Sequence, residues 1–433
     1  MTDKRGSKKA VSLASWWFKA REEEGRGVGI LSLDTTQKLK AVKKTPPSYN
    51  ALNSWLGQLA PWANATHLSN CLWMVIALME RGEVSLTRWL PYVPCRGKQA
   101  QSKQRRLSRW LHNSRINVHR LYKPLIQAAL ASWGEGCLYL SLDTSMYWEE
   151  YCLVRLAVVY RGRALPLVWR VLKHSSASVA FQEYRDLLVQ GSKRLPAGVK
   201  VVLLADRGFV QTEAMQFVTT QLGWHYRIRV KRSTWIWCNG KGWRQLKDIH
   251  LNPGEARCFH TIKLHKRQWF GPVHLALACN NVNGEYWAVV SDEPTNLQTF
   301  REYALRFDIE ESFRDDQSGG WNLQKSQVRS VTALSRLWFL LAVATLYLTA
   351  QGVQVVESGR RRWVDPHWFR GNSYFRIGWE WVKTAFFRRW KLLSHVSFSS
   401  VPDPQPAMAS RHQHDERSSR LEFTSRTFRF LPD

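Results

Sequence analysis

The stretch Cys137-Leu-Tyr-Leu-Ser-Leu-Asp-Thr144 marks the point where the chain changes from a helical pattern to an alternating one. Leucines occupy every second position and alternate with Tyr, Ser and Asp, which is the period of a strand with one buried face. Two more strand-like runs follow at 153–160 and 165–172, and the short turn 161–163 joins them. Three consecutive strands joined by short turns predict an antiparallel meander.

A fourth strand is predicted after a helix, and it ends at a second aspartate. Residues 180–194 have the apolar spacing of a helix, and the apolar run Val199–Ala205 after it stops at Asp206. A continuous apolar run of β character suits a strand buried on both faces. Strand, strand, strand, helix, strand is the order in which a ribonuclease H-like domain begins, and there the first and fourth strands are neighbours. We therefore expect Asp143 and Asp206 to lie side by side.

The segment 303–317, YALRFDIEESFRDDQ, combines unusual side chains on one face of a predicted helix. At 100° per residue, an arc of about 60° holds a phenol, a guanidinium, a carboxylate and an amide. These groups belong to Tyr303, Arg306, Glu310 and Gln317. Glu311, the neighbouring carboxylate, points about 100° away from Glu310. A structural helix would usually place apolar residues or a solvated mixture there, so we expect Glu310 to join the two aspartates.

Three carboxylates brought together suit the cleavage or exchange of phosphodiester bonds by two divalent ions. Hard cations such as Mg²⁺ take oxygen ligands, typically one or two protein carboxylates plus phosphate and water oxygens. We expect Asp143, Asp206 and Glu310 to be both the catalytic and the metal-binding residues. Each has an ordinary interpretation on its own: Asp143 as a turn cap, Asp206 as the first residue of a loop, and Glu310 as a solvated helix charge.

The composition predicts a polyanionic partner. The 433 residues include 63 Lys and Arg against 34 Asp and Glu, a net charge of +29. Nucleic acid is the first candidate and an acidic membrane surface the second, and a merely basic protein is the plain alternative. Some of the 23 tryptophans adjoin a cation, so the ring could stack on a base while the cation holds a phosphate, although packing is the alternative for most of them. These pairs are Arg88-Trp89, Arg109-Trp110, Arg362-Trp363 and Arg389-Trp390.

Cysteine usage and apolar runs predict a cytoplasmic protein. The seven cysteines form no CxxC pair, so we expect reduced thiols rather than a zinc knuckle or a redox motif. The first residues lack the apolar core of a secretory signal. The longest apolar run, Leu337–Leu348, has 12 residues, fewer than the ~18 to 20 that span a bilayer, and predicts a buried helix. We expect no membrane partner.

The N-terminal part of the chain predicts a DNA-binding domain. Residues 1–50 mix charge runs with Gly and Pro and predict a flexible arm, whereas 51–130 have a helical pattern. A two-faced basic helix at about 98–112 follows a helix, a short helix and a turn, an order that fits a helix-turn-helix-like DNA reader. A solvated basic face on an ordinary bundle is the alternative. The expected DNA contacts are Lys98, Gln101, Arg105 and Arg109.

The remaining segments complete the predicted domain order. The catalytic domain covers 131–350 and includes a β-rich insertion at about 228–292, where β-forming residues are separated by turn signals. A basic, aromatic helical region follows at 351–398, and the tail 399–433 is expected to be disordered. The predicted fold class is therefore α/β, a ribonuclease H-like catalytic core with a β-rich insertion, preceded by an all-helical DNA-binding domain.

These motifs resemble those of the DDE transposases of bacterial insertion sequences, and in particular the insertion-sequence-four (IS-four) family, which includes the Tn-five transposase. That family has a Tyr-x2-Arg-x3-Glu-x6-Lys motif around its catalytic Glu, and this chain has Tyr303-x2-Arg306-x3-Glu310-x6-Gln317. The second Asp of the family lies in an Asp-Arg-Gly-Phe/Tyr setting, which residues 206–209 match. The resemblance covers roughly residues 50 to 395.

The resemblance implies a metal-dependent enzyme that acts on double-stranded DNA. It implies two Mg²⁺ or Mn²⁺ ions and a homodimer that brings two transposon ends together. Tyr303 and Arg306 would grip phosphates near the cleaved end, and Gln317 replaces the family's Lys without its charge. Arg207, inside the Asp-Arg-Gly-Phe setting, is a further expected DNA contact. Relatives stack a flipped base on a Trp, for which Trp287 is the matching candidate and a core position the alternative.

The predicted function is a transposase of a bacterial cytoplasm, associated with the nucleoid. It would bind the terminal inverted repeats of an insertion sequence, cleave the ends and join the 3′-OH to target DNA. Two alternatives stay open. One is a structure-specific DNA nuclease on the same fold, which would cut and not join. The other is a catalytically weakened relative that only binds DNA.

Overall fold

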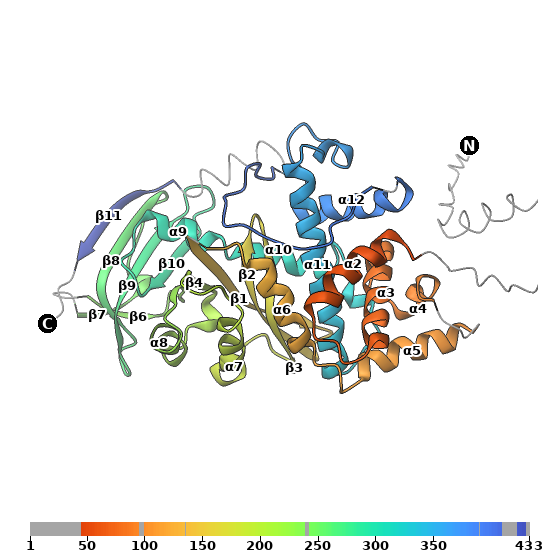
Figure 1. The fold of residues 1–433 in the computed structure, drawn as a ribbon. Coiled ribbons are helices and arrows are strands. Elements are labelled where there is room, and N and C mark those ends of the chain that lie inside the picture. The colour runs from red at the N-terminus through yellow and green to blue at the C-terminus, as the bar shows by residue number, and fades with distance from the viewer. Residues whose placement is uncertain are drawn as a thin grey trace, which may run out of the picture. The chain divides into compact units, whose positions relative to one another are not determined.

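The computed structural model describes residues 45–94, 99–134, 136–238, 242–388, 390–408 and 422–429. One compact unit spans Pro46–Asp433 and combines a large sheet with helices (Figure 1). Most of the expected arm at 1–50, Lys98 and parts of the expected tail lie outside the described residues. The domain boundaries expected within the unit stay predictions.

A mixed sheet of 11 strands runs through the unit in the order β3-β2-β1-β4-β5-β10-β9-β8-β6-β7, with β11 beside β8. The strands are β1 Cys137–Tyr147, β2 Tyr151–Tyr160, β3 Arg163–Lys173, β4 Lys200–Ala205, β5 His225–Arg229, β6 Trp235–Cys238, β7 Gly242–Gln245, β8 Glu255–Leu264, β9 Phe270–Cys279, β10 Tyr286–Ser291 and β11 Thr424–Arg429. The first three form an antiparallel meander, β4 pairs in parallel with β1, and β5 pairs in parallel with β4. The order of the first four strands is the one that the sequence predicts.

The helices account for the burial of the meander. They are α2 Pro47–Leu59, α3 Ala65–Arg81, α4 Leu86–Trp89, α5 Ala100–His112, α6 Val118–Leu130, α7 Phe181–Ser192, α8 Thr212–Thr220, α9 Leu297–Ala304, α10 Phe307–Asp316, α11 Val331–Glu357 and α12 Tyr374–Arg388. Every residue of β2 is buried, because α7 and α10 pack against β2 and β3, and α11 packs against β3. A strand enclosed in this way needs apolar side chains on both faces, as β2 has.

The β-rich segment continues the core sheet. β10 pairs antiparallel with β5 and with β9, and β8, β6 and β7 extend the sheet from there. β11 differs from the expectation of a disordered tail, because it pairs in parallel with β8. Phe428 on β11 stacks on Phe259 with ring centroids 5.1 Å apart. This apolar contact holds a segment whose composition otherwise favours disorder.

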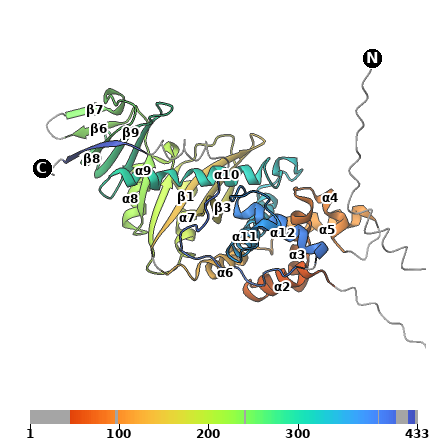
Figure 2. The ribbon, with the colours of Figure 1, turned by 90° about the horizontal axis from the view of Figure 1, so that it is seen from above.

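The described residues of 51–130 form helices α2 to α6, and these helices pack on the C-terminal ones. α3 begins after Asn64, whose side chain accepts a hydrogen bond from the Thr66 amide, and ends at Gly82 in the left-handed region. α3 packs against α2, α11 and α12 (Figure 2). Trp379 Nε1 on α12 donates to the Met79 carbonyl at 2.6 Å. The N-terminal helices therefore share one core with α11 and α12.

The expected buried helix at 337–348 is confirmed as the middle of α11. α11 has 27 residues and is long and apolar enough to span a membrane by length and composition alone, but 78% of its most apolar stretch is buried inside the protein. This burial is the property of a core helix. Five cysteines in the described part of the chain are free thiols, namely Cys71, Cys137, Cys152, Cys258 and Cys279.

Candidate active site

Asp143 and Asp206 directly follow paired residues of two neighbouring parallel strands, β1 and β4. β1 and β4 run in parallel with Leu142 opposite Ala205, so that Asp143 is the next residue of β1 and Asp206 is the first residue after β4. The turn after β4 is fixed because Asp206 Oδ1 accepts a hydrogen bond from the Gly208 amide at 2.7 Å. The structure therefore brings the two aspartates together at one edge of the parallel pair, as the strand order predicts.

The helix expected at 303–317 is divided into α9 and α10. At the junction, the Arg306 amide donates to the Tyr303 carbonyl at 3.0 Å, a bond between residues three apart. Such 3₁₀ bonds turn the chain by about 120° per residue instead of 100°, so the four side chains no longer share one arc. Tyr303 is fully buried on α9, and Gln317 lies just beyond the end of α10. Arg306 and Glu310 keep their spacing of one turn.

Arg306 connects α10 to the sheet. Its guanidinium lies 2.6 Å from Glu310 Oε1 and 3.3 Å from Asp143 Oδ2. The Arg306 side chain is 7% exposed, that of Asp143 15% and that of Glu310 46%. A buried cation therefore lies between a carboxylate of the sheet and a carboxylate of the helix.

The site shifts the pKa values of its own groups. Burial raises the pKa of Asp143 to about 6, an effect that Arg306 opposes and that the charges of Asp206 and Glu310 reinforce. Burial lowers the pKa of Arg306, but Tyr303, Asp143 and Glu310 outweigh it, so the net shift is upward. The charges of Asp206 and Glu310 therefore both act on Asp143, as expected of carboxylates that lie close together.

Glu311 is excluded from this set. Its Oε1 lies 2.8 Å from an Arg314 nitrogen, one turn further along α10. The two side chains are 37% and 71% exposed, so their pairing is a surface ion pair. The geometry therefore separates Glu310, which faces Asp143 through Arg306, from its neighbour.

Gln317 is attached to the sheet next to the aspartates. Its Nε2 donates to Ser145 Oγ on β1 at 2.9 Å. The amide thus bonds to the protein, where the resemblance implies a DNA phosphate. Because Ser145 lies two residues after Asp143 on β1, this bond also places the end of α10 over the same strand.

Trp287 occupies the core position that was the alternative to base stacking. It lies on β10, is 8% exposed, and its ring centroid is 5.7 Å from that of Tyr303. Phe300 and Phe307 complete the aromatic cluster around it. The ring is therefore not open to a flipped base in this structure, and Tyr303 is as enclosed as Trp287.

The C-terminal half of α10 is fixed by residues that the sequence analysis does not identify. Arg155 on β2 lies 2.5 Å from Asp316 Oδ2, and the two side chains are 1% and 5% exposed. Arg163 on β3 pairs with Asp315 at 2.7 Å, and Ser312 Oγ accepts a hydrogen bond from the β3 backbone at 2.8 Å. Burial raises the pKa of Asp316 to about 7 despite the opposing charge of Arg155. These bonds fix the direction in which α10 presents Glu310.

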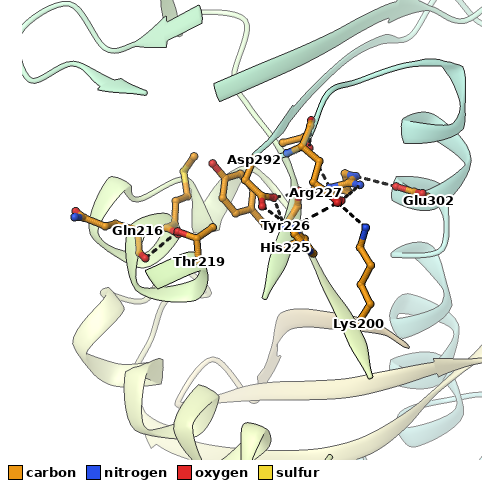
Figure 3. Close-up of polar contacts among 11 residues, drawn as sticks. Lys200, Gln216, Thr219, His225, Tyr226, Arg227, Asp292 and Glu302 are labelled. Carbon is orange, nitrogen blue, oxygen red and sulfur yellow. Dashed lines mark hydrogen bonds and ion pairs between the residues drawn. The ribbon is translucent and has the colours of Figure 1, made fainter. Parts of the chain in front are cut away.

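A second polar network fixes α9. Arg227 on β5 lies 2.8 Å from Glu302 on α9 (Figure 3). It also lies 2.8 Å from Glu293. His225 Nδ1, at the start of β5, lies 2.7 Å from Asp292 Oδ2. β5 is parallel to β4, and Arg227 lies opposite Leu204, two residues before Asp206. The helices on both sides of Arg306 are thus tied to the sheet.

The remaining expected DNA contacts lie outside α9, α10 and β10. Gln101, Arg105 and Arg109 are exposed on α5, which packs against α3, α4 and α11. Arg207 is exposed in the turn after β4, beside the acidic residues. Lys98 is outside the described residues. Of these residues, Arg207 lies near the carboxylates, and Gln101, Arg105 and Arg109 lie on the helical part.

A family comparison matches a stretch of the chain that includes part of the acidic site. Residues 149–347 match the transposase DDE domain. This match supports a DDE transposase, and it covers Asp206 and Glu310, whereas Asp143 precedes the matched segment. No curated protein matches the chain. The IS-four relationship therefore stays a prediction.

Two solved structures are similar to the chain at low identity. One is a piggyBac transposase synaptic complex with hairpin DNA, at 8% identity, covering 89% of this chain and 87% of that chain, with a TM-score of 0.44. The other is a Marinitoga piezophila Argonaute with guide RNA and target DNA, at 8% identity, covering 58% and 37%, with a TM-score of 0.21. At these TM-scores, the likeness adds nothing to the assignment.

DDE transposases generally use divalent metal ions, and the donor set fits such ions. The candidate ligands Asp143, Asp206 and Glu310 supply carboxylate oxygens, which Mg²⁺ and Mn²⁺ prefer. In the part of the chain that the structure describes, no three Asp, Glu, His or Cys side chains are close enough to hold an ion as they stand. The positive charge beside Asp143 and Glu310 is that of Arg306.

Proposed function

We propose that the protein is the transposase of a bacterial insertion sequence of the IS-four type, with a ribonuclease H-like catalytic core. It binds the terminal inverted repeats, cleaves the DNA at the ends, and joins the freed 3′-OH to target DNA. One observation carries the proposal: a helix cation, Arg306, joins Glu310 to Asp143, whose neighbour on the next strand is Asp206. The match of 149–347 to the transposase DDE domain supports the same class of enzyme.

Asp143, Asp206 and Glu310 would hold two Mg²⁺ or Mn²⁺ ions. When bound, such ions activate the attacking oxygen and stabilise the leaving oxygen of a phosphodiester. Contacts within the protein orient two of these ligands before any metal ion binds. The Gly208 amide orients Asp206, and Arg306 draws the half-exposed Glu310 toward the sheet. Pre-organised ligands lower the cost of assembling the site.

DNA recognition is assigned to two regions. The exposed face of α5, with Gln101, Arg105 and Arg109, would read the inverted repeats, and Lys98 would extend it. Arg207 would contact the DNA end beside the carboxylates. The excess of positive charge over the chain suits a duplex polyanion. A homodimer that holds two ends, in the bacterial cytoplasm, completes the proposal.

The test is a strand-transfer assay on the purified chain. A pre-cut transposon end is incubated with a supercoiled plasmid, with Mg²⁺, with Mn²⁺, or with EDTA. We expect joined product in both metals and none in EDTA. Cleavage of an uncut end without any joining would favour the nuclease alternative. Binding of the end without cleavage would favour the catalytically weakened relative.

A further inference from the structure

The connection between α11 and α12 exposes two large aromatic side chains. Trp368 is 84% exposed and Trp363 is 59% exposed. Exposed tryptophans on this scale are costly in water, because each leaves a large apolar ring unburied. Neither ring has a role in the acidic site. We name Arg360, Arg362, Trp363 and Trp368 the Trp–Arg surface.

The buried side chain of Arg361 fixes the loop that carries Trp368. Arg361 is buried, and its guanidinium donates to the carbonyls of His367 at 2.9 Å, Trp368 at 3.0 Å and Phe369 at 2.8 Å. It also pairs at 3.1 Å with Asp365, which is fully buried. A side chain fixed on such a loop loses little further freedom when a ligand binds. Trp368 is therefore exposed on a loop whose backbone is fixed by hydrogen bonds to Arg361.

Cations lie against the exposed rings. The Arg362 guanidinium is 4.4 Å from the ring centroid of Trp368, and that of Arg360 is 5.6 Å from Trp363. Trp363 in turn stacks on Trp381 of α12, with centroids 5.9 Å apart. The segment 358–391 contains nine lysines and arginines and two acidic residues. Its charge therefore favours an anionic ligand over a second copy of this basic chain.

We propose that the Trp–Arg surface binds a nucleic acid strand with unpaired bases. Trp368 and Trp363 would stack on bases, and Arg360 and Arg362 would hold the adjoining phosphates. Aromatic platforms flanked by cations bind single strands in this way, without reading sequence. The choice of DNA over an anionic lipid rests on the proposed function, since both are polyanions. The surface would engage an unpaired strand independently of duplex reading by α5.

The test compares two labelled strands of equal length by fluorescence anisotropy in EDTA, where metal-dependent cleavage does not occur. One strand is oligothymidine, and the other has the same backbone with abasic sites. We expect the full chain to bind oligothymidine at least about fivefold more tightly, because stacking adds affinity for each base. Trp368→Ala should remove this preference and leave the affinity for the abasic strand unchanged.

The matched control is Trp269→Ala. Trp269 is 58% exposed and has Lys263 Nζ 4.7 Å from its ring, but it precedes β9, in the β-rich part of the sheet. This variant should keep the preference for bases. Three results would overturn the proposal: equal binding of both strands by the wild type, an unchanged preference in Trp368→Ala, or an equal loss in Trp269→Ala.

Two further arms separate lipid binding and the proposed function. If Trp368→Ala lost binding to phosphatidylserine vesicles but kept the base preference, the surface would be a membrane contact and the proposal would fail. The strand-transfer assay uses a fully paired end, so its failure in the wild type would contradict the proposed function alone. The base preference measured in EDTA would then still decide the role of the Trp–Arg surface.

Discussion

The Arg306 guanidinium lies 2.6 Å from Glu310 Oε1, within a single turn of α10. The same group reaches Asp143 on the sheet at 3.3 Å, so one cation sets the position of the helix carboxylate relative to the strand. In the absence of metal, this arrangement limits the repulsion between the acidic groups. The two neighbouring glutamates of α10 therefore differ in role, because only Glu310 takes part in it.

The first prediction compares these two glutamates. Glu310→Gln should reduce metal-dependent cleavage of a transposon end by at least about a hundredfold, because it removes a charged ligand from a site worth several kcal/mol of transition-state stabilisation. Glu311→Gln should cleave at close to the wild-type rate, since it loses only an exposed pair with Arg314. Gel assays of end cleavage measure both. Equal rates for the two variants would contradict the assignment of Glu310.

The second prediction concerns pH. Burial raises the pKa of Asp143 to about 6 from its ordinary value of 3.8. The pKa of Asp143 is higher in the folded chain than in the unfolded chain, so the protonated carboxyl stabilises the fold. This stabilisation is lost as the pH rises through about 6. Asp143→Asn stays neutral, so it should raise the free energy of unfolding by about 1–3 kcal/mol at about pH 8 and change it little at about pH 4.

Urea unfolding in EDTA measures this difference, and far-UV circular dichroism of the folded variant serves as the control. The cleavage activity of the wild type should instead rise with pH, whereas the contribution of Asp143 to stability falls. Cleavage should fall as the pH drops below about 6, because a protonated Asp143 is a poor ligand for a divalent ion. If the variant were less stable than the wild type at about pH 8, the account of Asp143 would be wrong.

The third prediction concerns the buried pair under α10. Arg155→Met should lower the free energy of unfolding by about 3–5 kcal/mol, because it leaves the Asp316 carboxylate buried without its partner. Adding Asp316→Leu to it should restore much of the loss, since a buried ion pair is often no more stabilising than apolar residues of similar size. A double-mutant cycle by urea unfolding tests this. Additive losses from the two substitutions would exclude the coupling.

The fourth prediction concerns α5. Replacing both Arg105 and Arg109 by Ala should weaken duplex binding and reduce the slope of log affinity against log salt by about two, because each exposed cation neutralises about one phosphate. Gln104→Ala is the control, since Gln104 bonds to Thr87 within the helical part. Anisotropy titrations over several salt concentrations give the slope. An unchanged slope in the double variant would place the duplex elsewhere.

The position of the acidic set was predictable because it depends on the order of strands. A meander followed by a helix and a buried strand leaves few arrangements, and the parallel crossover places the fourth strand beside the first. Asp143 and Asp206 could therefore be placed together before any side chain was seen. Glu310 could be separated from its neighbour because it lies four residues after Arg306, within reach of its guanidinium.

Two features of the site depend on tertiary packing and could not be predicted from the sequence. The junction of α9 and α10 tightens into 3₁₀ bonds, which moves Tyr303 into an aromatic cluster with Trp287. The single arginine inside the apolar run of β2 is a signal for a buried ion pair. Its partner, Asp316, is 161 residues away in the sequence, so no local pattern could have identified it.

The most direct measurement is strand transfer by the wild type and by Asp206→Asn, side by side, with binding of the same end measured by mobility shift. The account predicts joined product for the wild type in Mg²⁺. It predicts none for the variant, although the variant binds the end as tightly as the wild type does. Joined product from Asp206→Asn at the wild-type yield would contradict the central claim that the three carboxylates form the active site.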